Sequence, residues 1–329
     1  MKICMIGDHS LNQDEGFKNI AFSLTNKLSN HHEFLNLNTE KVFFPRFWIA
    51  MKKFNPQIIH YIPGRTIKSF MILKAFAFYN TNAKTILSAF HPKIAFVPKN
   101  AIRLLKPDLI LTQSYKIEEK FNNLGSRTEF LPNGVDIEKF VPVSQKDKEK
   151  LREKYGIDKE KFVFLHVGHL IKVRNLQIFN KIQGEDNNQA IIIVSLHRKM
   201  DHKLYKNIKK SGCIIWRRYF KNIEEIYTLS DCYVFPVMKN HSIFSPLSVL
   251  EAMSCNLPVI TTKFEGLARV FEEGDGLFFV KNEADVYEAI KKIKNGTNVK
   301  TREKVMPYSW KGVAKRLEEI YAKLAKIEN

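Results

Sequence analysis

Short apolar runs rich in β-branched residues alternate with longer amphipathic stretches along the chain. A short apolar run bounded by turn residues is typical of a strand buried in a parallel sheet. Such runs occupy residues 3–6, 58–60, 85–90, 109–112, 162–167, 191–194, 233–235 and 259–261. Their alternation with helical patterns predicts βαβ units.

The alternation occurs twice, on either side of the turn-forming sequence LPNGVD at 131–136, which precedes a highly charged run at 145–154. A chain of 329 residues fits two domains of ordinary size. We therefore predict an α/β protein with two Rossmann-like domains, 1–140 and 141–308, whose parallel sheets face an interdomain cleft. Ligands of open parallel sheets collect beyond the carboxyl ends of the strands.

The end of the chain predicts one more amphipathic helix, with Ser309 as its N-cap. Its apolar residues recur on one face: Val313, Leu317, Ile320, Tyr321 and Leu324. We expect this segment, 309–329, to pack back onto the first domain.

Bulk composition is typical of a soluble globular protein, with 44% apolar residues. The apolar run at the start is too short for a signal peptide, and no window approaches an uncharged spanning helix. Four scattered cysteines without a C-x-x-C pair predict buried, reduced thiols rather than a metal site. We expect a cytoplasmic protein, with attachment to the inner face of the cell membrane left open.

The segment 241–258 predicts a short helix with defined ends. Ser245 is suited to the N-cap and Pro246 to the first helical position, whereas Asn256 is suited to a left-handed residue after the helix. The free amides at the helix start are then those of Leu247 and Ser248, where the helix dipole favours an anion such as a diphosphate.

Glu251 follows more than one turn later, where its carboxylate could accept hydrogen bonds from two ribose hydroxyls. Periodicity alone favours a solvated helix glutamate instead.

Five segments together resemble the retaining glycosyltransferases of family 4, which have the GT-B fold. They are LPNGVD at 131–136, HVGHLIKVRN at 166–175, LSDCYVFP at 229–236, LSVLEAMSCNLPVITT at 247–262 and YSW at 308–310. The resemblance implies a hexosyltransferase-type enzyme of cell-envelope glycan biosynthesis. Such an enzyme moves a sugar from a nucleoside-diphosphate donor to a lipid-linked or glycan acceptor, with retention of configuration.

The resemblance also implies roles for individual residues of the donor site. Glu251 matches the second glutamate of the family's E-x7-E motif, which binds the ribose, but Ile243 replaces the first. Arg174 stands where a diphosphate-binding lysine is expected, and His169 replaces an arginine. Lys172 or His169 could add a second donor to phosphate, although a charged turn after a strand explains Lys172 as well.

Two residues of the first domain match family positions. His91, after the run 85–90, matches the histidine that faces the donor sugar and is the catalytic candidate, with a structural role as the alternative. Gly16 matches the second glycine of the N-terminal glycine-rich loop, and Glu15 replaces the first. Arg217 and Arg218 are further candidates near the nucleotide, without a family match.

The net charge of +19 is concentrated in part of the first domain, because residues 41–107 contain twelve Lys or Arg and no Asp or Glu. Aromatic residues are interleaved throughout, which predicts binding to an anionic membrane surface. The alternative is a Lys-rich composition with aromatic core residues. Nucleic acid is not an expected partner, because no RNP-like, helix-turn-helix or finger pattern is present.

The leading prediction is therefore a metal-independent glycosyltransferase that uses a nucleotide sugar. Ile243 and His169 motivate one alternative, a noncatalytic GT-B relative that binds nucleotide or lipid as a scaffold. A GT-B enzyme of another reaction type, such as a sugar-nucleotide epimerase, is a third. The base, sugar, acceptor and oligomeric state are not encoded in a recognisable pattern.

Overall fold

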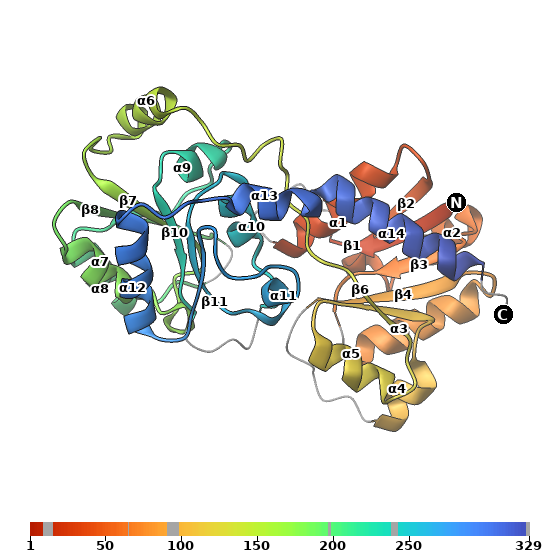
Figure 1. Ribbon diagram of the computed structural model, residues 1–329. Helices are drawn as coiled ribbons and strands as arrows, with labels where there is room; N and C mark the ends of the chain where they lie inside the picture. Colours follow the sequence, from red (N-terminus) through yellow and green to blue (C-terminus); the bar gives the residue numbers. More distant parts are fainter. Residues whose placement is uncertain (9–15, 65, 91–98, 197–198, 238–242, 327–329) are drawn as a thin grey trace. The chain divides into compact units, whose positions relative to one another are not determined.

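The chain forms two α/β units, each built on a six-stranded parallel sheet with flanking helices (Figure 1). The computed structural model describes residues 1–8, 16–64, 66–90, 99–196, 199–237 and 243–326. Unit 1 comprises the chain up to Gly134, residues 243–245 and the chain from Trp310 on; unit 2 comprises the rest. The predicted fold class, two Rossmann-like domains with parallel sheets, is confirmed.

Unit 1 has the strand order β2-β1-β3-β4-β5-β6. Its elements are β1 (Lys2–Gly7), α1 (Gly16–Leu28), β2 (Glu33–Asn38), the 3-10 turn η1 (Thr39–Lys41), α2 (Pro45–Phe54), β3 (Ile58–Tyr61), α3 (Ile67–Tyr79), β4 (Lys84–Ala89), α4 (Lys99–Leu105), β5 (Leu109–Thr112), α5 (Tyr115–Asn122), β6 (Thr128–Phe130) and, from the other end of the chain, α14 (Trp310–Ala325).

Unit 2 has the strand order β12-β11-β10-β7-β8-β9. Its elements are α6 (Gln145–Tyr155), β7 (Phe162–Gly168), η2 (Lys172–Arg174), α7 (Ile178–Gly184), β8 (Asn188–Val194), α8 (His202–Lys210), β9 (Ile214–Trp216), α9 (Glu224–Thr228), β10 (Cys232–Phe235), α10 (Leu247–Ser254), β11 (Val259–Thr262), α11 (Glu265–Ala268), β12 (Leu277–Val280), α12 (Glu283–Lys294), α13 (Thr301–Val305) and η3 (Met306–Tyr308).

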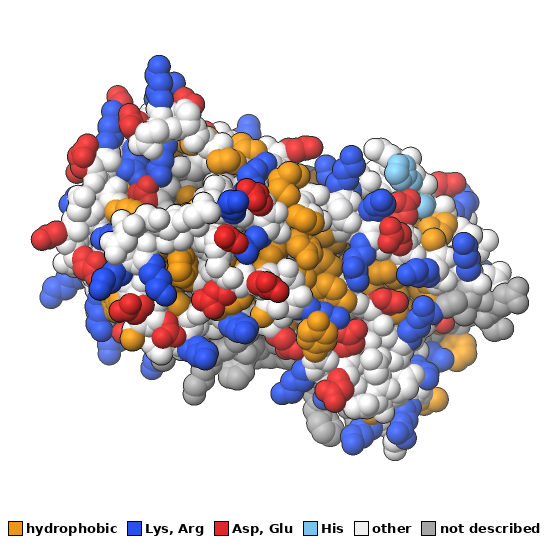
Figure 2. Space-filling view, in the orientation of Figure 1, with side chains coloured by type: hydrophobic (Ala, Val, Ile, Leu, Met, Phe, Trp, Pro, Cys, Tyr) orange, Lys and Arg blue, Asp and Glu red, His pale blue; other side chains and the backbone are white. Residues whose placement is uncertain are grey.

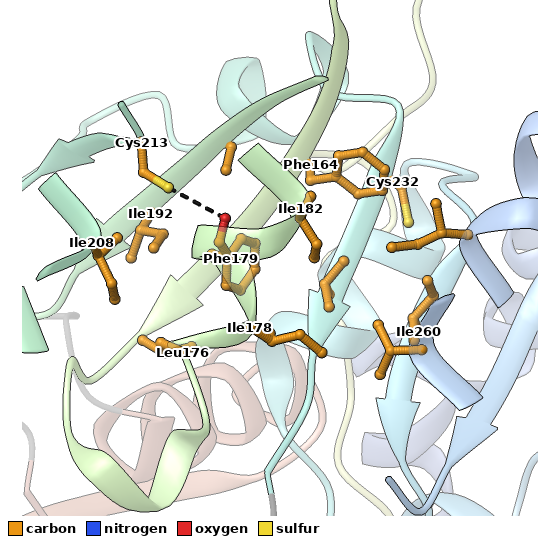
Figure 3. Close-up of a cluster of buried hydrophobic side chains, with 14 of the residues drawn as sticks. Phe164, Leu176, Ile178, Phe179, Ile182, Ile192, Ile208, Cys213, Cys232 and Ile260 are labelled. Carbon is orange, nitrogen blue, oxygen red and sulfur yellow. Dashed lines mark hydrogen bonds between the residues drawn. The ribbon is translucent and has the colours of Figure 1, made fainter. Parts of the chain in front are cut away.

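One core of unit 2 joins the central strands to the helices on one face of the sheet. Phe164, Ile192 and Ile260 of the strands pack against Phe179 and Ile182 of α7, all fully buried (Figure 3). Residues of α8 and α12 complete this cluster. The four cysteines are buried free thiols, as the sequence predicted.

The helix α14 is part of unit 1 and packs beside α1 (Figure 1). Its predicted apolar face is buried, as expected. Tyr321 Oη lies 2.6 Å from Nδ1 of His60 on β3, and Nε2 of the same imidazole lies 2.7 Å from Ser88 Oγ on β4. A buried hydrogen-bond chain therefore fixes the last helix to the first sheet.

Two of the segments at which the chain passes between the units, LPNGVD and YSW, lie side by side. Val135 N donates to Tyr308 O at 3.0 Å, and Val135 forms a parallel bridge with Ser309. A Cβ at Gly134 would lie only 2.5 Å from Cε3 of Trp310, so no larger residue fits there without displacing the indole. The LPNGVD and YSW segments thus meet through a glycine that allows close packing.

Candidate nucleotide-binding site

The helix α10 begins one residue later than the sequence predicted. Pro246, expected at the first helical position, is instead the N-cap, with φ −65° and ψ 127°. The fixed φ of proline suits either position, and the extended ψ excludes it from the helix. Ser245, the expected cap, makes no side-chain cap; its carbonyl accepts from Asn133 Nδ2 at 2.7 Å.

The later start leaves two backbone amides open at the first turn of α10. Val249 N donates to Pro246 O at 3.2 Å. Within the described part of the chain, the amides of Leu247 and Ser248 have no hydrogen-bond acceptor. Because the positive end of the helix dipole also lies here, this turn is suited to an anion such as phosphate.

The other end of α10 is closed as expected. Asn256 adopts the left-handed conformation, with φ 55°. Its amide donates to Met253 O at 2.9 Å, and the amide of Leu257 donates to Ala252 O at 3.1 Å, which is the Schellman pattern. These bonds fix the length of the helix and hence the position of its open first turn.

Glu251 is half-buried and is held by a phenol. Tyr227 Oη, from α9, donates to Glu251 Oε2 at 2.7 Å. Burial raises the pKa of the Glu251 carboxyl above its ordinary value, whereas the bond from Tyr227 and the charge of Lys139 lower it. Periodicity alone favoured a solvated glutamate at this position. That interpretation is wrong, because the buried Tyr227 holds the Glu251 side chain in place.

The strands β7 and β10 are neighbours in the centre of the sheet, at the point where the strand order reverses. Ligands of open α/β sheets bind at the carboxyl ends of such strands. The ring of His166 on β7 lies beside those of Phe235 and Tyr233 on β10, with centroids 5.2 and 6.5 Å away, and these two centroids are 6.3 Å apart. Its Nδ1 lies 2.9 Å from Val234 O, and burial lowers its pKa to about 3, so the imidazole is neutral.

Arg174 packs on Phe235, one ring of this aromatic cluster. It ends η2 and is only 9% exposed, with its guanidinium carbon 4.8 Å from the ring centroid of Phe235. The left-handed Asn175, φ 54°, turns the chain directly after it. The charge of Arg174 lowers the pKa of both His166 and Tyr233, which places it beside both rings.

Tyr233 links the parts of the site. Burial raises its pKa above the ordinary range, and a hydrogen bond with Ser248 and the charge of Arg174 oppose that rise, whereas Glu251 adds to it. Its hydroxyl also donates to Val167 O at 3.3 Å. Arg174, Ser248 and Glu251 therefore surround one buried phenol.

A family model described as Glycosyl transferases group 1 matches residues 147–311, half of the chain. The matched region contains every residue of this site. The chain belongs to the group 1 glycosyltransferase family.

This group 1 chain is similar in sequence to two curated proteins. It is 28% identical over 251 residues to the UDP-Gal:alpha-D-GlcNAc-diphosphoundecaprenol alpha-1,3-galactosyltransferase of Escherichia coli. The matched region covers 70% of this chain and 58% of that protein. It is 24% identical over 241 residues to spore coat protein SA of Bacillus subtilis, with 63% and 62% covered. The chain thus spans less than two thirds of the length of either relative.

Solved structures share the fold along almost the whole chain. The HepE protein of Anabaena in complex with UDP superposes with a TM-score of 0.75 and 15% identity, covering 98% of this chain and 100% of that one. A glycosyltransferase from Rickettsia africae gives 0.76 and 16%, covering 99% of both. These likenesses establish the GT-B fold of this group 1 glycosyltransferase.

The other predicted residues of this group 1 chain are less closely tied to the site. His169 is half-buried and lowers the pKa of His166, which places it near that imidazole, whereas Lys172 is exposed on η2. Ile243 is half-buried and precedes Phe244, which packs in the core of unit 1. Arg218 stacks on Phe220 at 4.6 Å in the loop after the edge strand β9.

The remaining two candidates, His91 and Gly16, belong to unit 1. His91 lies outside the described residues, so its predicted place opposite the donor sugar stays a prediction. Gly16 is the first residue of α1, and Glu15 before it lies outside the described residues.

The sequence reasoning missed the aromatic frame of the site: Tyr227, Tyr233, Phe235 and His166. A signal was present, because His166 and Tyr233 are the polar rings within runs of otherwise aliphatic or phenylalanine strand residues. A polar ring in a buried strand needs a hydrogen-bond partner and so indicates a built site.

Proposed function

We propose that this chain is a retaining glycosyltransferase of family 4 that transfers a hexose from a nucleoside-diphosphate donor to a lipid-linked or glycan acceptor. Membership of the group 1 family supports the reaction class. The Escherichia coli relative is a galactosyltransferase with UDP-Gal as donor and a diphosphoundecaprenol-linked acceptor, which supports the choice of substrates. Retention is supported by the resemblance of the five sequence segments to family 4.

The observation that carries the proposal is the convergence of Arg174, Ser248 and Glu251 on Tyr233. A cation, two open helix amides and a carboxylate within one site match the parts of a nucleoside diphosphate. The diphosphate takes the Leu247 and Ser248 amides and the guanidinium, which can bond two phosphate oxygens at once. The carboxylate of Glu251 then accepts the ribose hydroxyls.

The same groups supply the catalytic effect. Negative charge grows on the diphosphate as the bond to the sugar breaks, and fixed cations and amides stabilise that charge without reorganisation. Arg174 is prepared for this, because its stacking on Phe235 fixes its plane. The proposal includes His91 facing the sugar and no requirement for a metal, so activity that survives EDTA is the expected result.

We further propose that unit 1 binds the anionic inner face of the cell membrane. Phe43 and Phe78 are 72% and 74% exposed, and the ammonium groups of Lys68 and Lys74 lie 4.9 and 5.3 Å from the centroids of these rings. Exposed rings beside basic groups suit the interface of an anionic bilayer. On the face drawn in Figure 2, acidic and basic side chains are interspersed over both units.

None of the described helices has the length and apolar content needed to cross a bilayer.

A panel of nucleotide sugars, beginning with UDP-hexoses, tests the transferase proposal, with the anomeric configuration of the product read by NMR. We expect turnover on at least one donor, lost in Glu251→Gln and kept in Glu288→Gln, which changes an exposed glutamate of α12. Tight nucleotide binding without turnover on any donor and acceptor pair would instead support a scaffold. Equal activity of both variants would remove the ribose role of Glu251.

A further inference from the structure

A groove of about 580 Å³ opens in unit 1. It lies at the carboxyl end of β2 and is closed by η1 and the first turn of α2. Its lining includes Asn36, Leu37, Asn38, Lys41, Phe44 and Arg46. None of these residues has a part in the proposed transfer reaction.

The groove is not at the place where this sheet would hold a reacting ligand. The strand order of unit 1 reverses between β1 and β3, so the crevice for such a ligand lies beyond those two strands. The strand β2 is the edge of the sheet, on the far side of β1. A ligand in the groove is therefore anchored beside the reaction site of this sheet rather than in it.

Cationic and polar side chains form part of the lining of the groove, beside the apolar Leu37, Phe44 and Phe47. Lys41 and Arg46 are exposed, and neither has an ion pair or side-chain hydrogen bond among the described residues. Glu40 is the single acidic residue between Glu33 and Asp108. The Asn38 side chain accepts from Glu40 N at 3.0 Å, which leaves its amide group to donate. Two cations and amide donors together favour a phosphate.

Exposed aromatic rings lie in and beside the same groove. Phe44 lines the groove and is 61% exposed, and the neighbouring Phe43 is 72% exposed. Lys68 Nζ lies over the ring of Phe43 at 4.9 Å, so a further cation lies beside these rings. Cations and exposed rings in one place suit an amphiphilic anion, which neither a free nucleotide nor a glycan would be.

We propose that this groove binds the phosphate headgroup of an anionic bilayer phospholipid, with its acyl chains against Phe43 and Phe44. The inference rests on the membrane association proposed above and gives it a defined site. A bilayer lipid, rather than the lipid-linked acceptor, fits the groove because it lies at the edge strand and not at the strand-order reversal. Binding here would hold unit 1 at a fixed orientation on the membrane.

Vesicle cosedimentation of the full chain tests the site against general electrostatic attraction. The groove variant is Lys41→Gln with Arg46→Gln, and the matched control is Lys99→Gln with Arg103→Gln on α4, which removes the same two charges from exposed positions of unit 1. With phosphatidylglycerol vesicles, we expect the groove variant to lose about 25-fold in partition, roughly fivefold per residue, and the control to stay within about threefold. Equal losses would overturn the groove and leave membrane association standing.

A soluble probe separates the site from the membrane. Dihexanoyl phosphatidic acid, used below its micelle concentration, should quench or shift the fluorescence of Trp48, whose indole donates to Val42 O at 2.8 Å beside the groove. This response should be absent in the groove variant, with circular dichroism confirming its fold. No response in the wild type would overturn the site, whereas a response without vesicle binding would overturn only membrane association.

Farnesyl phosphate identifies the source of the headgroup. We expect that displacing dihexanoyl phosphatidic acid from the groove requires farnesyl phosphate at an equal or higher concentration. Competition at a tenfold lower concentration, lost in the groove variant, would overturn the assignment to a bilayer lipid in favour of a prenyl-phosphate acceptor.

Discussion

The hydroxyl of Tyr227 donates a hydrogen bond to the carboxylate of Glu251 at 2.7 Å, and this bond opposes the effect of burial on the acid. The phenol itself is held edge-on by Phe140 at 5.4 Å and packs on Tyr233 at 5.7 Å. The proposed ribose ligand therefore depends on a residue that would not itself contact the nucleotide.

Tyr227→Phe should weaken nucleotide binding and move its acid limit to higher pH. Because the bond from Tyr227 lowers the pKa of Glu251, its loss raises that pKa further, and the carboxylate needed by the ribose is protonated at a higher pH. Calorimetric titration of a nucleoside diphosphate across pH 5–8 measures this shift. An unchanged pH profile would contradict the positioning role.

The same variant should also be less stable at neutral pH, by about 1.5–3 kcal/mol, since it leaves a buried carboxylate without its donor. A raised pKa means that folding favours the protonated acid, so the difference should shrink as the pH falls through the pKa of Glu251. Tyr287→Phe is the control, because among the described residues its buried hydroxyl has no hydrogen-bond partner. Urea unfolding at pH 7 and pH 4.5 makes the comparison.

Arg174→Lys should reduce kcat about tenfold or more while keeping the charge. Lysine lacks the planar fork that bonds two phosphate oxygens and the stacking surface that lies on Phe235 at 4.8 Å. Phe235→Leu should cause a smaller fall, because the guanidinium remains but loses its support. Steady-state kinetics with a saturating donor decides; full activity of Arg174→Lys would show that only charge matters.

Gly134→Ala should destabilise the protein by about 1–3 kcal/mol, because the added methyl would lie 2.5 Å from the Trp310 ring. Gly184→Ala, at the end of α7, is a matched control with no atom within 4 Å of the new Cβ. It should be neutral or slightly stabilising. Equal unfolding free energies for both variants would show that the indole moves aside freely.

Two buried imidazoles should make both units sensitive to mild acid. Burial lowers the pKa of His60 and of His166 to about 3, whereas the unfolded chain binds these protons near pH 6.5. Stability is therefore fully present above pH 6.5 and falls by about 1.4 kcal/mol per pH unit for each residue below it. His60→Gln should flatten this slope between pH 6.5 and 4.5, and a variant of the exposed His202 should not.

Each of the eight strands predicted from the sequence lies between two other strands of its sheet. The four that were not predicted, β2, β6, β9 and β12, are the edges of the two sheets. An edge strand is half covered, so its sequence can be polar, as in EFLNLN of β2 and TEF of β6, which lack the continuous apolar run of a central strand. The edge strands β9 (IIW) and β12 (LFFV) are apolar runs like the central ones, so half coverage does not explain why they were not predicted.

The site was predictable where it depends on local chemistry. The open turn of α10 follows from proline and the helix pattern, and Arg174 and Glu251 follow from the resemblance. Tyr227 and Phe235 could not be found in this way, because they act through contacts with Glu251 and Arg174 that are distant in sequence. Spacing along one strand or helix does not encode such contacts.

The attachment of α14 to unit 1 has a consequence for biosynthesis. The sheet that leaves the ribosome first contains His60, but the phenol of Tyr321 that bonds to it is made only after all of unit 2. Most of unit 2 precedes α14 in the sequence. We therefore expect unit 2 to complete its core before unit 1, although the sheet of unit 1 is translated first.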